Sequence, residues 1–370
     1  MIIHSNYATS GPLAGLRVIE FAGIGPGPFA CMLLSDMGAD VIRIDRPDAR
    51  LADTNDIISR GRTRVLLDLK EESDCEQVKA LLAQADVLVE GFRPGVMERL
   101  GLGPDVITLL NPRLVYGRMT GWGQSGPLSQ AAGHDINYIS IAGALAAIGP
   151  CDGAPVPPLN IVGDYAGGSL YLIAGILAAV IEARSSGKGQ VVDAAISDGV
   201  ASLMSLFQTM SLRGTHKEAR GSNLLDGGAP FYATYETADN AYVSLGPIES
   251  KFFGLLCEKL NIPQDLRDAQ GDRSRWPDLR LAIAASIRQH TRAQWCERLE
   301  GTDVCFAPVL SLGEAPTHPH NQFRKTFVEI NGVVQAAPAP RFSRTPSAIQ
   351  VSTPKVDFSP EAVLLKWQFR

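Results

Sequence analysis

The sequence lacks a surplus of positive charge. Its 370 residues contain 34 Lys and Arg against 39 Asp and Glu, which gives a formal net charge of −5. Proteins that bind nucleic acids hold the phosphate backbone with an excess of Lys and Arg, so we expect no nucleic-acid partner. An anionic ligand of this chain must therefore bind to a locally basic segment.

A long hydrophobic run and a targeting signal are also missing. The longest apolar run covers residues 170–181, well short of the ~20 residues that a membrane-spanning helix needs. Residues 1–10 show no basic start followed by an apolar core, and the last three residues are not a peroxisomal signal. We therefore expect a cytoplasmic protein with no membrane partner.

Clustered metal ligands are absent as well. The six cysteines are widely separated, with no C-x-x-C pair and no zinc-like spacing. His318 and His320 form an H-x-H pair, but no third ligand follows at a sensible spacing. We therefore expect reduced thiols and no metal site.

The pattern of apolar residues predicts an α/β fold with a large doubly wound domain and a smaller α+β domain. A chain of 370 residues exceeds the ~150 residues of a typical domain, so we expect two domains. The first third alternates strands and helices, which favours a parallel sheet. We predict strands at 17–22, 40–45, 64–70, 85–92 and 113–120, and helices at 29–37, 73–84 and 94–110.

The middle of the chain predicts buried helices and then a domain boundary. Segments 136–148 and 165–184 are too continuously apolar for surface helices, so we expect both to lie against the sheet. A strand at 190–195 and a long helix at 198–212 lead to a glycine-rich loop, residues 221–228.

The last third predicts the smaller domain. Segments 231–237 and 242–246 flank a hairpin turn, helices are expected at 252–260, 279–289 and 292–299, and the final residues should form a short tail. The glycine-rich loop at 221–228 therefore separates a large first domain from this smaller one.

The first turn of the chain indicates a phosphorylated nucleotide ligand. The run Gly23-Ile24-Gly25-Pro26-Gly27-Pro28 has only part of the G-x-G-x-x-G pattern, and its prolines remove amide donors, so an NAD site is disfavoured. Arg46 directly follows the second strand, where a guanidinium suits a phosphate or stacks on adenine. Coenzyme A and NADP both carry a phosphorylated ADP. Residues 43–70 are locally basic, although a solvated charged face would look the same.

Five segments carry the most specific pattern in the chain. They are Gly15-Leu16-Arg17-Val18-Ile19-Glu20 with Gly25-Pro26-Gly27-Pro28, Gly38-Ala39-Asp40-Val41-Ile42-Arg43-Ile44-Asp45-Arg46-Pro47, Gly133-His134-Asp135-Ile136-Asn137-Tyr138, and Asp226-Gly227-Gly228-Ala229-Pro230-Phe231-Tyr232. Together they resemble the alpha-methylacyl-CoA racemases of the family III CoA-transferase (CaiB/BaiF-type) superfamily. The resemblance runs from about residue 11 to 343.

This resemblance implies a large Rossmann-like, coenzyme-binding domain over 1–195, a linker helix and loop over 196–230, a small α+β domain over 231–310, and a segment over 311–370 that returns to the large domain. It also implies an interlocked homodimer whose active sites lie between the large domain of one chain and the small domain of the other. It implies His134 and Asp164 as the two proton carriers, with Glu249 hydrogen-bonded to the histidine. The substrate would be an acyl-CoA of fatty-acid metabolism, with coenzyme A as part of the substrate and no separate cofactor. The implied coenzyme-binding residues are Arg46, Leu67, Asp68, Leu69, Lys70, Gly91, Phe92, Arg93, Arg99, Gly133, Asp135, Ile136, Asn137 and Tyr138.

The implied reaction inverts the carbon beside the thioester by removing a proton from one face and returning one to the other, through an enolate. An imidazole is well matched to this task, whereas a carboxyl group must have its pKa raised by burial. By itself Asp164 could be only the N-cap of a helix that begins after it, and His134 could be only a capping residue.

Three other functions stay open. A CoA-transferase would use Asp164 as the nucleophile and covalent acyl carrier. An acyl-CoA-binding module without catalysis, or an NADP oxidoreductase, would explain the basic segment or the first turn. These last two leave His134, Asp164 and Glu249 without a role, and the transferase has no need of His134 and Glu249, so we favour the racemase. The sequence does not identify the acyl group.

Overall fold

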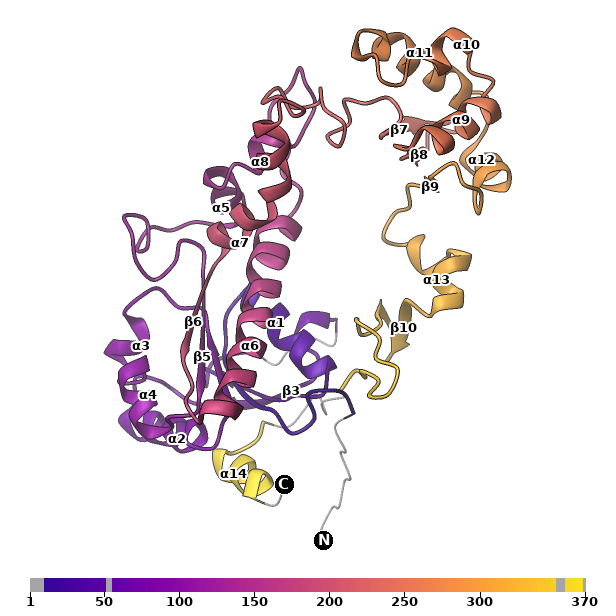
Figure 1. Ribbon diagram of the computed structural model, residues 1–370. Coiled ribbons are helices and arrows are strands. Elements are labelled where there is room, and N and C mark those ends of the chain that lie inside the picture. Colours follow the sequence, from indigo (N-terminus) through magenta and orange to yellow (C-terminus); the bar gives the residue numbers. More distant parts are fainter. Residues whose placement is uncertain (1–9, 51–54, 351–356, 369–370) are drawn as a thin grey trace. The chain divides into compact units, whose positions relative to one another are not determined.

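The computed structural model describes residues 10–50, 55–350 and 357–368. The chain divides into two compact units (Figure 1). The large unit comprises residues 1–142, 158–203 and 325–370, and the small unit comprises residues 143–157 and 204–324. The domain boundaries expected from the sequence stay a prediction.

A parallel sheet forms the centre of the large unit, as the alternation of strands and helices predicts. Its six strands are ordered β3-β2-β1-β4-β5-β6, so the strand order reverses between β1 and β4. Ligands of open α/β sheets bind at such a point, beyond the carboxyl ends of the strands. The strands are β1 (Arg17–Phe21), β2 (Asp40–Asp45), β3 (Arg62–Leu66), β4 (Val87–Glu90), β5 (Val115–Thr120) and β6 (Val191–Ala195).

Helices cover this sheet in two groups. Helix α1 (Pro26–Asp36) packs with α6 (Tyr171–Ser186), and α6 also lies along β5 and β6. Helix α2 (Glu72–Leu82) packs with α4 (Pro104–Leu110) and α14 (Pro360–Gln368) in the other group (Figure 1).

The single helix predicted over 94–110 is wrong. The structure has two helices, α3 (Val96–Arg99) and α4, because Gly101 takes the left-handed conformation at φ 67° and Pro104 starts a new helix. Leu102 between them is fully buried, so the break lets this side chain enter the core.

The expectation that segment 136–148 is one helix against the sheet is also wrong. Helix α5 (Asp135–Ile141) ends before Gly143, which has φ 83°, and a short 3₁₀ turn, η2 (Leu145–Ala147), follows in the small unit. Helix α5 packs on α7 (Ile196–Leu203) and η3 (Ile161–Leu170) rather than on the sheet, and Ile141 is 61% exposed.

The second apolar segment forms one long helical stretch, in which the π-helix η3 continues into α6. Within the described residues, 161–186 is long and apolar enough to cross a membrane by composition alone, and half of its most apolar window is buried within this chain. Its packing on β5 and β6 is that of a core helix.

The short tail expected at the C-terminus is instead helix α14. Trp367 is 1% exposed, and its indole nitrogen donates a hydrogen bond to Asp40 Oδ2 at 3.1 Å. Arg17 donates to the carbonyl of the same tryptophan at 2.7 Å. The helix therefore closes the core of the large unit beside β1 and β2. The hairpin of β10 (Phe327–Ile330) and β11 (Val333–Ala336) also belongs to this unit.

The small unit is built on an antiparallel sheet. Strands β7 (Ala233–Glu236) and β8 (Tyr242–Leu245) form the predicted hairpin, and β9 (Phe306–Pro308) adds a third strand that the sequence did not reveal. The predicted helix 198–212 is interrupted at Met204, which separates α7 from α8. The small-unit helices are α8 (Ser205–Leu212), α9 (Ser250–Lys259), α10 (Gln264–Arg267), α11 (Trp276–Ile287), α12 (Arg292–Leu299) and α13 (Pro319–Arg324).

Candidate active site

His134 stands at the start of α5 in the large unit. It is the N-cap residue of this helix, and the Asn137 side chain accepts a hydrogen bond from its backbone N–H at 3.0 Å. The imidazole is exposed. The backbone is therefore fixed by helix capping while the ring remains accessible to a ligand.

Asp164 lies in the first turn of η3 and is half-buried. The N-cap residue of η3 is Asn160, so the alternative in which Asp164 only caps a following helix is wrong. Asn160 donates a side-chain hydrogen bond to Asp164 Oδ2 at 3.1 Å. Burial raises the pKa of Asp164, and the negative charge of Asp135 raises it further, against the opposing effects of Asn160 and His134.

Asp135 links the two predicted proton carriers. It follows His134 in the chain, and its Oδ2 accepts the backbone N–H of Asp164 at 2.7 Å. Asp135 is buried, and Oδ1 has no hydrogen-bond partner within the described part of the chain. The structure thus brings His134, Asp135 and Asp164 into one neighbourhood, although the sequence analysis assigned Asp135 only to coenzyme binding.

Glycines allow backbone to approach these carboxylates closely. A Cβ at Gly25 would lie 3.1 Å from Asp164 Oδ2, and Gly25 has φ 70°, which disfavours other residues. A Cβ at Gly163 would collide with the Asp135 carboxylate. The sequence analysis interpreted Gly25 as part of a nucleotide-type turn and did not connect it to Asp164.

Glu249 belongs to the small unit. It is the N-cap residue of α9, and its side chain is exposed. The hydrogen bond between Glu249 and His134 that the resemblance implies stays a prediction.

The predicted coenzyme-binding segments follow the carboxyl ends of strands in the parallel sheet. Arg46 comes directly after β2, residues 67–70 follow β3, residues 91–93 follow β4, and residues 133–138 lie in the connection after β5. Since parallel strands share one carboxyl edge, these segments emerge at the same edge of the sheet. Leu67 itself is a core residue, so its side chain is unavailable to a ligand.

The basic segment 43–70 is only partly free for a ligand. Arg43, Arg60, Arg62 and Arg64 form ion pairs with Asp45, Asp36, Glu20 and Asp357, and none of the four arginine side chains is more than 19% exposed. They stabilise the fold. Arg46, Arg50 and Lys70 are the exposed cations of this segment.

A buried ionic network holds the segment 91–99. The Glu90 side chain is 0% exposed and accepts the Phe92 N–H at 2.7 Å and Arg118 Nε at 2.9 Å. Arg118 also pairs with Glu98 on α3 at 2.8 Å. The network therefore ties the loop that carries Arg93, and the helix that carries Arg99, to strand β5. The sequence analysis missed it because its charged members lie on separate elements.

The comparisons with known proteins agree with the expected family. The model of CoA-transferase family III matches residues 13–359. The chain is 42% identical to mouse alpha-methylacyl-CoA racemase and 41% identical to the human enzyme, over 90% of this chain and 87% of each relative. It is 30% identical to the succinyl-CoA–L-malate CoA-transferase beta subunit of Chloroflexus aurantiacus, over 96% of this chain and 94% of that one.

Solved structures agree as well. A CAIB/BAIF family protein from Brucella suis matches with a TM-score of 0.82 at 24% identity, over 97% of this chain and 100% of that chain, which shows the fold alone. The Mycobacterium tuberculosis protein Rv3272 matches with a TM-score of 0.78 at 26% identity, over 93% and 96% of the two chains. The chain belongs to CoA-transferase family III.

Proposed function

We propose that the protein is an alpha-methylacyl-CoA racemase, an isomerase that interconverts the (R) and (S) forms of 2-methylacyl-CoA thioesters. The observation that carries this proposal is the 41–42% identity to two racemases over 90% of the chain, against 30% to the malate CoA-transferase subunit. The cluster of His134, Asp135 and Asp164 supplies the groups that the reaction needs.

In the proposed mechanism one carrier removes the α-proton and the other delivers a proton to the opposite face. An aspartate is normally too weak a base, and too strong an acid, to share this work near neutral pH. Burial and the charge of Asp135 both raise the pKa of Asp164, which brings its affinity for a proton closer to that of an imidazole. His134 and Asp164 are the proposed pair, and Glu249 is proposed to orient the histidine.

For coenzyme A we propose the exposed cations Arg46 and Lys70, together with Arg93 and Arg99, as partners of its phosphates. Each lies beyond the carboxyl end of β2, β3 or β4. Coenzyme A enters only as part of the substrate, and the proton transfers need no separate cofactor.

The active assembly is proposed to be a homodimer. Several large apolar side chains of the large unit are exposed along and beside η3 and α6. They are Leu159, Ile161, Leu170, Ile181 and Leu203. Such exposure marks an interaction surface. We propose that a second copy of this chain covers this apolar surface. Light scattering in detergent-free buffer should then show a dimer. A monomer, or binding of the protein to lipid vesicles, would contradict this proposal.

Solvent isotope exchange tests the function. In D₂O, with one 2-methylacyl-CoA and no acceptor acid, the racemase proposal predicts deuterium at the α-carbon and formation of the other enantiomer. A CoA-transferase would instead form an acyl-Asp164 anhydride and need an acceptor acid to complete turnover. If coenzyme A is transferred only when an acceptor acid is present, and no deuterium enters the α-carbon, the protein is a CoA-transferase and the racemase proposal is refuted.

A further inference from the structure

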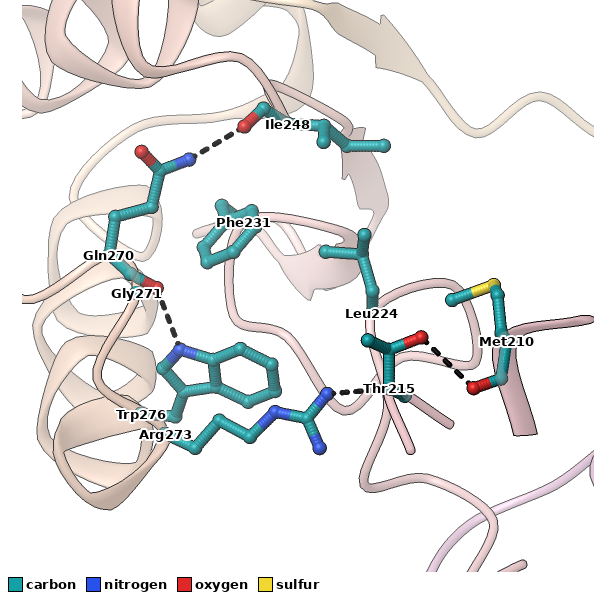
Figure 2. A pocket seen from close by; sticks show the side chains of 9 residues that line it. All are labelled: Met210, Thr215, Leu224, Phe231, Ile248, Gln270, Gly271, Arg273 and Trp276. Carbon is teal, nitrogen blue, oxygen red and sulfur yellow. Dashed lines mark hydrogen bonds between the residues drawn. The ribbon is translucent and has the colours of Figure 1, made fainter. Parts of the chain in front are cut away.

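The pocket of the small unit, about 320 Å³ in volume, offers no group that could move a proton (Figure 2). Its lining is mainly apolar, with Leu224, Phe231 and Trp276 among its side chains. Arg273 is the only ionisable side chain in this lining; a guanidinium stays protonated, and this one donates to the Thr215 carbonyl at 2.9 Å. The groups that can assist the proposed proton transfers are those that contact Asp164 in the large unit.

The backbone of Asp164 is fixed on both sides of its Cα. Its N–H donates to Asp135 Oδ2 at 2.7 Å. Its carbonyl oxygen lies 3.0 Å from the hydroxyl of Ser169, which is fully buried and also lies 2.7 Å from the carbonyl oxygen of Pro26. The direction of the carboxyl group therefore depends on the side-chain torsions of Asp164 alone.

Asn160 acts on this carboxyl group. Its Nδ2 donates to Asp164 Oδ2 at 3.1 Å. An asparagine at the N-cap of a helix commonly accepts a backbone N–H of the first turn. Asn160 is the N-cap residue of η3, but its side chain makes no such bond. Asp135 on α5 accepts the N–H of Asp164 in its place, so the amide of Asn160 is available to the carboxyl group.

The two carboxyl oxygens of Asp164 therefore differ. Oδ2 accepts the amide of Asn160 and faces the first turn of the chain, where a Cβ at Gly25 would lie only 3.1 Å from it. Oδ1 accepts no hydrogen bond from the described part of the chain. A protonated oxygen is a poorer acceptor, so a proton on Oδ2 would weaken the bond from Asn160. Protonation is therefore favoured on Oδ1.

We propose that Asn160 is a positioning residue that holds Oδ2 of Asp164 and leaves Oδ1 as the oxygen that carries the transferred proton. This inference rests on the proposed function. When Asp164 is the base, a lone pair of Oδ1 forms the new O–H bond, the α-C–H bond breaks, and its electron pair passes into the enolate. His134, as the imidazolium, then protonates the opposite face. In the reverse direction the proton on Oδ1 returns to the enolate. Oδ2 accepts the same amide throughout, so the carboxyl group needs no rotation between the two steps.

Removal of the amide donor tests this assignment. Asn160→Leu keeps a branched side chain of similar size without a donor, and Asn160→Asp replaces the donor with an acceptor. The matched control is Tyr171→Phe. It removes one hydrogen bond, from the Tyr171 hydroxyl to Ser202 Oγ at 2.7 Å, from the helix that continues η3.

Two readouts report on Asp164 itself. The first is the pH profile of kcat/KM for α-proton exchange. The second is the C=O stretch of protonated Asp164 in infrared difference spectra, identified by its loss in Asp164→Asn, and it needs no catalytic activity. The charged groups that act on Asp164 are Asp135 and His134, and neither changes in these variants.

Both readouts should move in a defined direction. Burial raises the pKa of Asp164 and the bond from Asn160 opposes that rise, so Asn160→Leu should move the acid limb of the profile to higher pH. Asn160→Asp should move it further, because two neighbouring carboxyl groups share one proton. In Asn160→Leu the C=O stretch should move to a higher wavenumber, because Oδ2 loses its donor, and kcat should fall about tenfold. Tyr171→Phe should leave all three unchanged.

The outcomes separate the two proposals. An acid limb and a C=O stretch that stay in place in Asn160→Leu overturn the role of Asn160, even if the wild type exchanges α-protons normally. A C=O stretch that moves to a higher wavenumber, in a wild type that exchanges no α-proton, supports the assignment of the proton to Oδ1 and refutes the racemase. If Asn160→Leu does not fold, the acid limb of Asn160→Asp, whose side chain has the size of asparagine, decides: a limb at higher pH supports the role of Asn160, and an unmoved limb overturns it.

Discussion

Removing Arg118 should reveal how strongly the buried ionic network of Glu90, Arg118 and Glu98 stabilises the proposed coenzyme-binding edge of the sheet. In Arg118→Met the Glu90 carboxylate, 0% exposed, loses its guanidinium and keeps the Phe92 N–H. Breaking a buried pair costs about 3–5 kcal/mol because one charge stays buried without a partner. The pair with Glu98 adds little, roughly 0–1 kcal/mol, because that acid is 45% exposed.

The stability that Arg118→Met loses should increase as the pH rises. Burial already raises the pKa of Glu90 in the wild type, and removal of the guanidinium raises it further. An acid with a raised folded-state pKa binds more protons when folded than when unfolded, so stability falls as pH rises above the ordinary glutamate range. Urea unfolding of Arg118→Met should therefore show a larger loss at pH 8 than at pH 5.

The double variant Glu90→Gln with Arg118→Met is the matched control. This double variant removes both charges and should recover part of the stability that Arg118→Met loses. In Arg118→Met, KM for the acyl-CoA should rise by a larger factor than kcat falls. A loss below about 1 kcal/mol at pH 8, or a double variant that is less stable than the single one, would refute the role assigned to the network.

Three further outcomes follow from the site. The first tests whether an active site uses His134 of one chain and Glu249 of its partner. The variants His134→Ala and Glu249→Ala should each be inactive alone, but a mixture of the two that is allowed to exchange subunits should recover about a quarter of wild-type activity, because half of the dimers are mixed and each mixed dimer has one intact site. If each site lies within one chain, the mixture should stay inactive. Gly25→Ala should lower kcat about tenfold by forcing a Cβ against the Asp164 carboxylate, and it should also lower Tm because Gly25 has φ 70°; an unchanged kcat contradicts the close approach. Asp135→Asn removes a negative charge that raises the pKa of Asp164, so the acid limb of the kcat/KM profile should move to lower pH; a limb that stays or rises contradicts this coupling.

The parallel sheet could be predicted because each strand is a short apolar run bounded by turn residues. The interruption of 94–110 was also encoded locally, in Gly101 and Pro104, but the apolar content of the segment obscured it. Helix α14 could not be inferred from its own residues, because its burial depends on a bond between Trp367 and Asp40, on strand β2.

The candidate active site could also be predicted only in part from the sequence. The resemblance pointed to His134 and Asp164, whereas the structure alone shows that Asp135 accepts the N–H of Asp164, 29 residues further along the chain. Contacts between distant residues depend on how η3 packs on α5, and no local pattern in the sequence records that packing. No local pattern records the close approach of Gly25 to Asp164 either, because Gly25 lies at the start of α1 and Asp164 lies in η3.

The two-carrier claim is tested most directly by following one enantiomer in D₂O through its first turnovers, with chiral separation and mass analysis of both forms. Two separate carriers predict that the newly formed enantiomer contains deuterium from the start while the remaining starting enantiomer keeps its protium. Equal deuterium in both enantiomers at early times would mean that a single group serves both faces, and would contradict the pairing of His134 with Asp164.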